Sequence, residues 1–241
     1  MTVTYIFHSC YLLEFDGFSI LFDFYKDGKR DDGTFWVSDY LLGKPDDLYV
    51  FCSHSHPDHY NPEILRWGIT KSNVKYIFSK EVMNNSEITV YQNIAFLDKF
   101  ETYEDNRIRV QAFGSTDTGG SFVVDVSGKR YFHAGDLNNW HWNEEVPFLE
   151  STGYENSYLC QLELLAEKVD QVYLAMFPVD PRLGKDYMRG AEQFVNRIAT
   201  DYFLPMHFGE NYEKANAFSR YARLQNCTFL PVYKKGQSYK L

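Results

Sequence analysis

Three of the seven histidines in this 241-residue chain fall within one hexapeptide, and this cluster constrains the fold more than any other feature. His54, His56, Asp58 and His59 directly follow the apolar run at 48–53, which has the length of a buried strand. Side chains at alternate positions of such a loop can point to the same side. Imidazole and carboxylate groups are the ligands that Zn²⁺ and similar divalent ions take in proteins. The cluster therefore predicts a metal site at the end of a strand.

Strand-like runs fill the first half of the chain, and strands alternate with helices in the second half. Hairpins are expected around Asp16-Gly17 and Ser127-Gly128, because such pairs favour tight turns between apolar runs. Helices are expected over 61–69, 157–169 and 188–200, with a shorter one between 26 and 47. Further strands are expected at 75–79, 88–91, 94–97, 107–113, 171–178 and 201–209, with one or two edge strands in 228–241. This mixture predicts a layered α/β or α+β sandwich.

Composition limits the possible functions. Asp and Glu number 33 against 24 Lys and Arg, a net charge of −9, which argues against broad binding to nucleic acid. No stretch of 18 apolar residues occurs, so no membrane span is expected. The first residues do not read as a signal peptide, and the four cysteines are scattered without a C-x-x-C pair. We therefore expect a single domain over 1–241 in a cytoplasmic protein.

Four segments together resemble one known family. The hexapeptide His-x-His-x-Asp-His resembles the signature of the metallo-β-lactamase superfamily, and three more segments are similar to motifs of that family in its order. They are FHSCYLLEFDGFSILFDFY at 7–25, FHAGDLNNW at 132–140 and LPMHFGE at 204–210. The first of the three is most similar to the ascorbate-6-phosphate lactonase-like branch. The resemblance implies an α+β fold, a four-layer αββα sandwich.

The resemblance also implies a set of metal ligands. His54 and His56 would bind one metal ion, Asp58, His59 and His207 would bind a second, and Asp136 would bridge the two. The implied cofactors are two divalent ions, with zinc as the first expectation and manganese or iron as alternatives.

One family position departs from the pattern. The family usually has a third histidine for the first metal, often in His-Thr-x-Gly-Ser, but no histidine lies between His59 and His133. Asp117 begins a segment, Asp-Thr-Gly-Gly-Ser, that overlays this motif with Asp in place of His. A carboxylate can coordinate in the same way and would favour manganese or iron as well as zinc. The alternative interpretation is an ordinary turn, in which case the first metal is weakly bound or absent.

Five further residues are candidates to support the ligands or to contact the substrate. Asp23, at the end of the first hairpin, is expected to support the histidine loop, and His8 to lie near the pocket. His133 is expected to be a core residue or a support. His141, between two tryptophans, could face the substrate or merely pack. Arg182 suits a phosphate or carboxylate group, although an Asp-Pro turn with a surface arginine explains it equally well.

These residues predict a metal-dependent hydrolase that acts on a small ester, lactone or phosphoester. Metal binding lowers the pKa of bound water to about 7, and Asp58 would orient the nucleophile and handle its proton. The expected partner is a small-molecule substrate, with neither nucleic acid nor membrane. A non-hydrolytic metal- or ligand-binding module, acting as sensor or scaffold, is an alternative that the missing histidine favours. A di-iron protein that reacts with oxygen is another, because Asp117 is compatible with iron.

Overall fold

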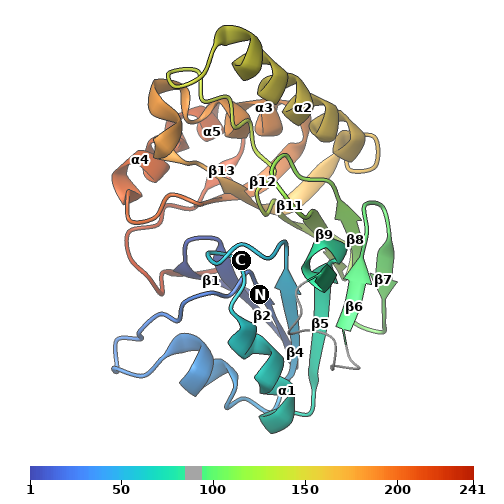
Figure 1. Cartoon of the computed structure of the whole chain (residues 1–241). Coiled ribbons are helices and arrows are strands. Elements are labelled where there is room, and N and C mark those ends of the chain that lie inside the picture. Colours follow the sequence, from blue (N-terminus) through green and yellow to red (C-terminus); the bar gives the residue numbers. More distant parts are fainter. Residues whose placement is uncertain (85–93) are drawn as a thin grey trace. The chain divides into compact units, whose positions relative to one another are not determined.

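The computed structural model describes residues 1–84 and 94–241, and the chain forms two compact units (Figure 1). Unit 1 comprises Met1–Asp98 and Tyr233–Leu241, and unit 2 comprises Lys99–Val232. Each unit is built on a mixed seven-stranded sheet flanked by helices, which confirms the predicted α+β class. The strand expected at 88–91 lies outside the described residues.

The sheet of unit 1 has the order β14-β1-β2-β3-β4-β5-β6, antiparallel from β14 to β3 and parallel from β3 to β6. The predicted hairpin at Asp16-Gly17 is confirmed, because β2 and β3 pair directly up to Phe15 and Phe18. The strands are β1 (Thr2–Phe7), β2 (Cys10–Phe15), β3 (Phe18–Phe22), β4 (Asp47–Cys52), β5 (Val74–Ser79), β6 (Ile94–Leu97) and β14 (Ser238–Lys240).

Short helical segments cover one face of this sheet. They are η1 (Trp36–Leu41), η2 (Pro62–Arg66), α1 (Trp67–Thr70) and η3 (Lys80–Asn84). The helix predicted at 61–69 is therefore a 3₁₀ turn that runs into one α-helical turn. It begins at Asn61, whose side chain accepts a hydrogen bond from the Glu63 N–H, with proline at the first helical position. Val37, Leu41 and Trp67 pack with the strands into one buried apolar cluster.

The sheet of unit 2 has the order β13-β12-β11-β10-β9-β8-β7, antiparallel from β7 to β10 and parallel from β10 to β13. The predicted hairpin at Ser127-Gly128 joins β9 to β10, and both turn residues have positive φ (52° and 80°), as a tight turn of this kind requires. The strands are β7 (Thr102–Glu104), β8 (Arg109–Phe113), β9 (Ser121–Val126), β10 (Lys129–His133), β11 (Gln171–Pro178), β12 (Ala199–Met206) and β13 (Thr228–Phe229).

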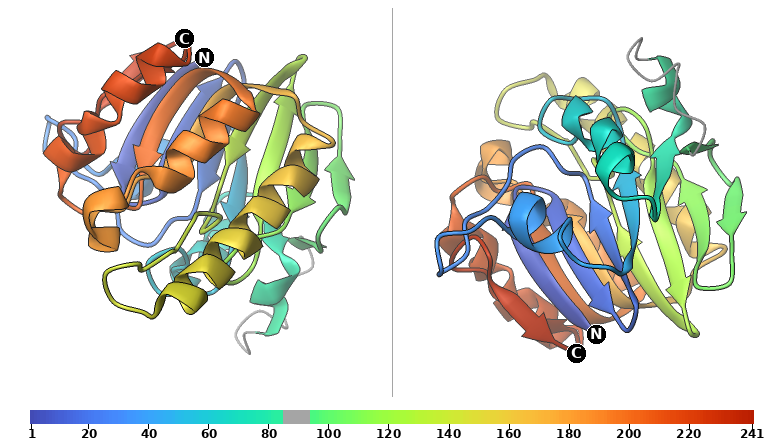
Figure 2. Two further views of the ribbon diagram at one scale, coloured as in Figure 1. Left: turned by 90° about the horizontal axis from the view of Figure 1, so that it is seen from above. Right: turned by 90° about the horizontal axis from the view of Figure 1, so that it is seen from below.

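Two helices lie across this second sheet, as Figure 2 shows for α2 and α3. Aromatic contacts hold α3 in place: the ring of Phe194 stacks on Phe132 with centroids 5.2 Å apart and lies 4.8 Å from Phe177. The helices of unit 2 are α2 (Phe148–Ala166), η5 (Pro181–Asp186), α3 (Arg189–Arg197), α4 (Tyr212–Ala217) and α5 (Ser219–Leu224).

The parallel parts of the sheets determine where polar side chains gather. In unit 2, β10, β11 and β12 run in the same direction, so the segments after them leave from one edge of the sheet. Asp136, Asp180 and His207 lie on these segments. In unit 1, β1, β3 and β4 likewise end at one edge. His8, Asp23 and the predicted histidine loop follow these three strands.

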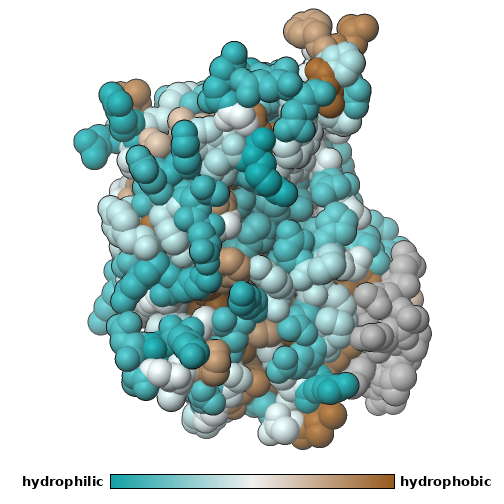
Figure 3. All heavy atoms as spheres, turned by 60° about the vertical axis from the view of Figure 1, so that its left-hand side comes forward, coloured by the Kyte–Doolittle hydropathy of each residue, from teal (hydrophilic) through white to brown (hydrophobic). Residues whose placement is uncertain are grey.

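One face of the molecular surface is mostly hydrophilic. Hydrophilic side chains dominate the face in Figure 3, and apolar ones occur there in small separate patches. No helix in residues 1–84 and 94–241 combines the length and the apolar character needed to cross a membrane.

Candidate metal centre

The predicted hexapeptide forms a tight loop after β4 and buries two of its three imidazoles. His54 and His59 are fully buried, whereas His56 is exposed. The ring centroids of His54 and His59 lie 4.1 Å apart. The N–H groups of His59 and Tyr60 both donate to the carbonyl of His56 at 3.0 Å, which closes the loop.

Asp23 anchors this loop from the end of β3. Its Oδ1 accepts the Ser53 N–H at 2.8 Å, and its Oδ2 accepts the Ser53 hydroxyl at 2.6 Å and His59 Nδ1 at 2.7 Å. The carboxylate is fully buried and the residue has a left-handed φ of 45°. Because His59 donates through Nδ1, the neutral ring has its lone pair on Nε2.

The same carboxylate also determines the tautomer of His54. The Ser53 hydroxyl donates its hydrogen bond to Asp23, so it accepts one from His54 Nδ1 at 2.9 Å. The Nε2 atom of His54 then also has a lone pair. Both buried imidazoles are therefore in the form that binds a metal ion through Nε2, and this donor set fits a divalent cation.

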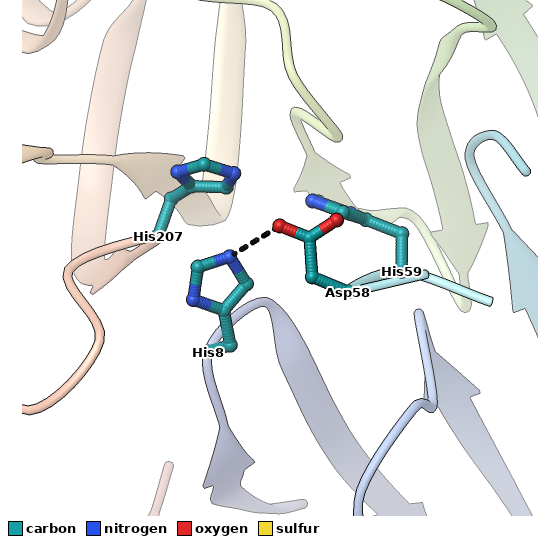
Figure 4. A group of neighbouring side chains, drawn as sticks. All are labelled: His8, Asp58, His59 and His207. Atoms are coloured by element: carbon teal, nitrogen blue, oxygen red, sulfur yellow. Dashed lines mark ion pairs between the residues drawn. The ribbon is translucent and has the colours of Figure 1, made fainter. Parts of the chain in front are cut away.

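Asp58 and His8 lie close to His59 in unit 1. His8 Nε2 is 3.4 Å from Asp58 Oδ2, and Figure 4 shows the two side chains facing each other. One possible ligand atom from each of His8, Asp58 and His59 lies within 4.8 Å of the others. The φ of His8 is 58°, and its N–H donates to the hydroxyl of Tyr5 at 2.9 Å.

Glu81 is a neighbour of the loop that the sequence did not indicate. Its carboxylate accepts the N–H of Ser55 at 2.8 Å and the Ser55 hydroxyl at 2.7 Å. A glutamate 26 positions away carries no local pattern that would have connected it to the loop.

In unit 2, two predicted ligands face each other. His207 Nε2 lies 3.3 Å from Asp136 Oδ1, and both side chains are nearly buried. His207 Nδ1 donates to Asp180 Oδ2 at 2.9 Å, so in the neutral ring the lone pair on Nε2 points at the Asp136 carboxylate. These two electron-pair donors repel each other, and a proton or a metal ion held between them would relieve the repulsion.

Asp180 supports His207 and also holds Arg182. Burial raises the pKa of Asp180, but hydrogen bonds from His207 and Arg182 outweigh it and hold that pKa below its usual value. The guanidinium donates to the carboxylate through Nε at 2.8 Å and Nη2 at 2.6 Å. Asp180 also accepts the N–H of Arg182 and begins η5, so the expected Asp-Pro turn is present as well.

Asp117 lies on the loop between β8 and β9 and is exposed. One of its carboxylate oxygens lies within 4.8 Å of one from Asp136. The hydroxyl of Thr116 donates to the carbonyl of Asn138 at 2.6 Å and accepts the N–H of Asn138 at 3.0 Å. These bonds join the Asp117 loop to the Asp136 loop. Two carboxylates this close favour a cation between them.

His133 and His141 both lie in the interior of unit 2. His133 Nδ1 accepts the N–H of Gly135 at 3.2 Å, within the turn that leads to Asp136. His141 Nδ1 accepts the N–H of Asn143 at 3.2 Å, so its Nε2 donates to the carbonyl of Asp186 at 3.2 Å. The structure therefore gives both histidines backbone partners.

A cavity of about 350 Å³ opens beside the unit 2 ligands. His141 was the residue of segment 138–142 that the sequence suggested for substrate contact. In the structure the two tryptophans that flank it, Trp140 and Trp142, line the cavity instead. The lining residues are Thr116, Asp117, Asp136, Trp140, Trp142, Tyr154, Arg182 and His207. A larger concavity of about 510 Å³ lies by the β9–β10 turn, around Lys129, Arg130 and Asp170, and none of the predicted site residues lines it.

Known proteins share this chain's fold. The family described as "Beta-lactamase superfamily domain" matches residues 2–152. Among curated proteins, no sequence matches the chain. A novel metallo hydrolase, Igni18 from the archaeon Ignicoccus hospitalis, is 16% identical with a TM-score of 0.68, over 100% of this chain and 98% of that one.

Two further solved structures are similar throughout this chain. The isothiocyanate hydrolase from Delia radicum gut bacteria is 13% identical with a TM-score of 0.60, over 100% of this chain and 99% of its own. CmlA from Streptomyces venezuelae, a diiron β-hydroxylase, is 14% identical with a TM-score of 0.69, but this chain covers only 54% of it. At these identities the structures show the fold, while the family match covers more than half of the chain. The chain belongs to the metallo-β-lactamase superfamily of metal-dependent hydrolases.

Proposed function

We propose that this protein hydrolyses a small ester, lactone or phosphoester with the help of two divalent metal ions. Zinc is the proposed metal, with manganese or iron as alternatives. The proposed ligands of the first ion are His54, His56 and Asp117, those of the second are Asp58, His59 and His207, and Asp136 is shared.

The observation that carries this proposal is the hydrogen-bond chain from Asp23. That single buried carboxylate fixes the tautomers of His54 and His59, and a metal ligand that coordinates through Nε2 needs this support on its other nitrogen. Asp180 gives the same support to His207 in unit 2. A purely structural histidine needs no such arrangement, and three of them supported in this way favour a metal centre.

The reaction would use the chain's own groups as follows. Divalent ions, when bound, lower the pKa of water to about 7 and polarise the oxygen of the group under attack. The Asp58 carboxylate, whose side chain is 43% exposed, would accept the proton of the attacking water. His8 Nε2, 3.4 Å from Asp58 Oδ2, can orient that carboxylate or pass the proton on to the leaving group.

Two lines of support concern the substrate. The segment at 7–25 resembles the ascorbate-6-phosphate lactonase-like branch, which favours a lactone or a phosphorylated sugar acid. The names of two structural relatives, a metallo hydrolase and an isothiocyanate hydrolase, support hydrolysis in a more general sense.

Metal analysis and turnover of the purified protein test the proposal together. We expect about two equivalents of divalent metal and hydrolysis of at least one ester, lactone or phosphodiester probe. His54→Ala and Asp136→Ala should lower both the metal content and the rate. Asp170→Asn, at a surface carboxylate whose side chain is 91% exposed, is the matched control and should change neither. The proposal fails if the two variants keep the metal content and the hydrolysis of the unmodified protein. One tightly bound metal without turnover would instead indicate a non-hydrolytic module.

A second candidate function, oxygen chemistry at a di-iron site, has one specific observation in its favour. Asp58, Asp117 and Asp136 make the proposed donor set rich in carboxylates, which suits iron. CmlA, a diiron β-hydroxylase, has a similar fold over about half of its length. Iron-loaded and zinc-loaded protein distinguish the two functions. Oxygen uptake over many turnovers by the iron form, with a chemical reductant added, supports the second, and hydrolysis by the zinc form supports the first.

A further inference from the structure

The wall of the unit 2 cavity contains a tryptophan in a strained backbone conformation. Trp142 has a φ of 42°, a left-handed conformation that costs a bulky residue roughly 1–2 kcal/mol. Its carbonyl accepts the N–H groups of Glu145 at 2.8 Å and Val146 at 3.0 Å, and these bonds hold the conformation. Strain of this kind persists where the surrounding structure imposes it, often at binding sites. Here it directs an indole to the cavity.

A second tryptophan is fixed beside the first. Trp140 Nε1 donates to the carbonyl of Asp136 at 2.8 Å, which determines the position of its ring. The two indole planes are within 15° of parallel, and their centroids are 6.3 Å apart. Trp140 and Trp142 therefore form a stacked pair of indoles in the cavity lining, next to the proposed ligand Asp136.

The guanidinium group of Arg182, a positive charge in the cavity lining, is also held in position. Arg182 lines the cavity and its side chain is 62% exposed, yet two of its nitrogens are held by the buried carboxylate of Asp180. An arginine held in this way loses little conformational freedom when it binds a ligand. A guanidinium group suits carboxylates and phosphates because its N–H groups match their oxygens.

We infer that this cavity binds a small planar substrate that carries an anionic group, with Trp140 and Trp142 contacting the planar part and Arg182 selecting the anion. This inference rests on the proposed function, because it concerns the substrate of the same site. A volume of about 350 Å³ is near the lower end for ligand pockets and suits a ligand of one or two rings.

The charges around the cavity indicate that Arg182 selects an anion when the proposed metal ions are bound. Asp117 and Asp136 line the same cavity and would repel an anion. Divalent cations bound to them would offset that repulsion. Arg182 should therefore discriminate between ligands in the metal-loaded protein, and the test uses that form.

The test measures binding by calorimetry with two ligands of the same shape, 2-naphthoate and its neutral counterpart 2-naphthamide. We expect naphthoate to bind about tenfold more tightly or better, as a charge-assisted hydrogen bond allows. Arg182→Gln should remove this preference, while Arg182→Lys, which keeps the charge, should retain part of it. Arg130→Gln, at an exposed arginine outside the cavity, should leave it unchanged. 2-Naphthyl phosphate distinguishes a phosphate from a carboxylate preference.

Substitutions of Trp142 test the contact with the planar part of the ligand. Trp142→Leu should weaken naphthoate and naphthamide alike, by about tenfold, and Trp142→Phe should restore much of the loss because it keeps a flat ring. Metal content and circular dichroism of each variant show whether it has folded. Equal affinity for the two ligands, or a preference that persists unchanged in Arg182→Gln, overturns the selection of an anion. Unchanged binding in Trp142→Leu overturns the planar contact.

These outcomes separate the inference from the proposed function, because none of them requires turnover. Arg182-dependent binding in a protein that hydrolyses nothing would support the inference and contradict the proposed hydrolysis. Hydrolysis of neutral and anionic substrates at equal rates, without Arg182-dependent binding, would support the proposed hydrolysis and contradict the inference.

Discussion

At the scale of single residues, backbone strain is concentrated around the candidate centre. Seven non-glycine residues of the described chain have positive φ, and four of them are near proposed ligands: His8 and Asp23 beside the histidine loop of unit 1, and Trp142 and His207 on the cavity wall of unit 2. Each such residue costs roughly 1–3 kcal/mol. Three of the four follow directly on a strand, where a sharp change of direction points the side chain away from the sheet edge. The chain therefore gives up some stability for the orientation of these groups.

Asp23 offers a direct test of how much this orientation matters. Asp23→Asn replaces an acceptor of three hydrogen bonds by a group that cannot accept them all, and it leaves His59 and Ser53 without their charged partner. We expect the zinc affinity to fall by about 10–100-fold, as measured by competition with a chelating dye. Asp16→Asn, in the exposed turn of the first hairpin, is the control and should bind zinc as the unmodified protein does.

Cysteine reactivity tests the burial of individual side chains. Cys160 is exposed, whereas burial raises the pKa of Cys10 and Cys52 well above the usual value and that of Cys227 to about 12. A disulfide reagent reacts with the thiolate form of a cysteine that solvent can reach, and burial disfavours that form. A disulfide reagent should therefore modify one thiol quickly in the native protein and four after unfolding. Cys160→Ser should remove the fast phase, and a fast phase that remains would contradict the assignment.

At the scale of secondary-structure elements, local patterns predicted the strands better than the helices. Both hairpins formed where Asp16-Gly17 and Ser127-Gly128 stand, because tight turns depend on neighbouring residues. The helix expected from 157 begins at Phe148 instead. Its first turn exposes Phe148 and Leu149, at 82% and 83%, so the periodicity that identifies a buried helix face is missing there. The short helices α4 and α5 were not expected either.

In the candidate site, too, the residues in local motifs were predicted and the contacts between distant segments were not. The hexapeptide, Asp136 and His207 were identified from short motifs next to strand ends. Contacts between distant segments carried no local signal: Asp180 and His207 are 27 positions apart, and Ser55 and Glu81 are 26 apart. The tautomers fixed by Asp23 also appear only in the folded chain, because they depend on which group donates to which.

The space around two helical glycines predicts opposite effects of alanine substitution on the free energy of unfolding. A Cβ on Gly190 would lie 2.8 Å from the backbone nitrogen of Asn139 and closer still to the Asn138 side chain. Gly190→Ala should therefore lower the free energy of unfolding by about 1–3 kcal/mol and reduce metal affinity. Gly153 lies in α2 with open space around it, so Gly153→Ala should raise that free energy by up to about 1 kcal/mol. Urea titration measures both, and a stabilised Gly190→Ala would contradict the predicted contact.

At the scale of the whole molecule, the acidic charge links stability to the proposed cations. The chain carries a net charge of −9, and the proposed ligands include three carboxylates. A ligand that binds only the folded protein stabilises it by about 2.7 kcal/mol at 100 times its dissociation constant. Chelation should therefore lower the melting temperature by roughly 5–10 °C, and added zinc should restore it, both measured by calorimetry. A melting temperature that does not respond to chelator or to zinc would contradict a stabilising metal.

The pairing of β14 with β1 has a consequence for how the chain is made. Met1 and Leu241 exchange backbone hydrogen bonds, and β14 is the edge strand beside β1, although unit 2 lies between them in the sequence. The ribosome therefore releases all of unit 2 before the sheet of unit 1 receives its seventh strand. Until then β1 is an unprotected edge that could pair with another nascent chain. The sheet of unit 1 therefore stays incomplete until residues 238–240 have been synthesised, and β1 is open to wrong pairing during that interval.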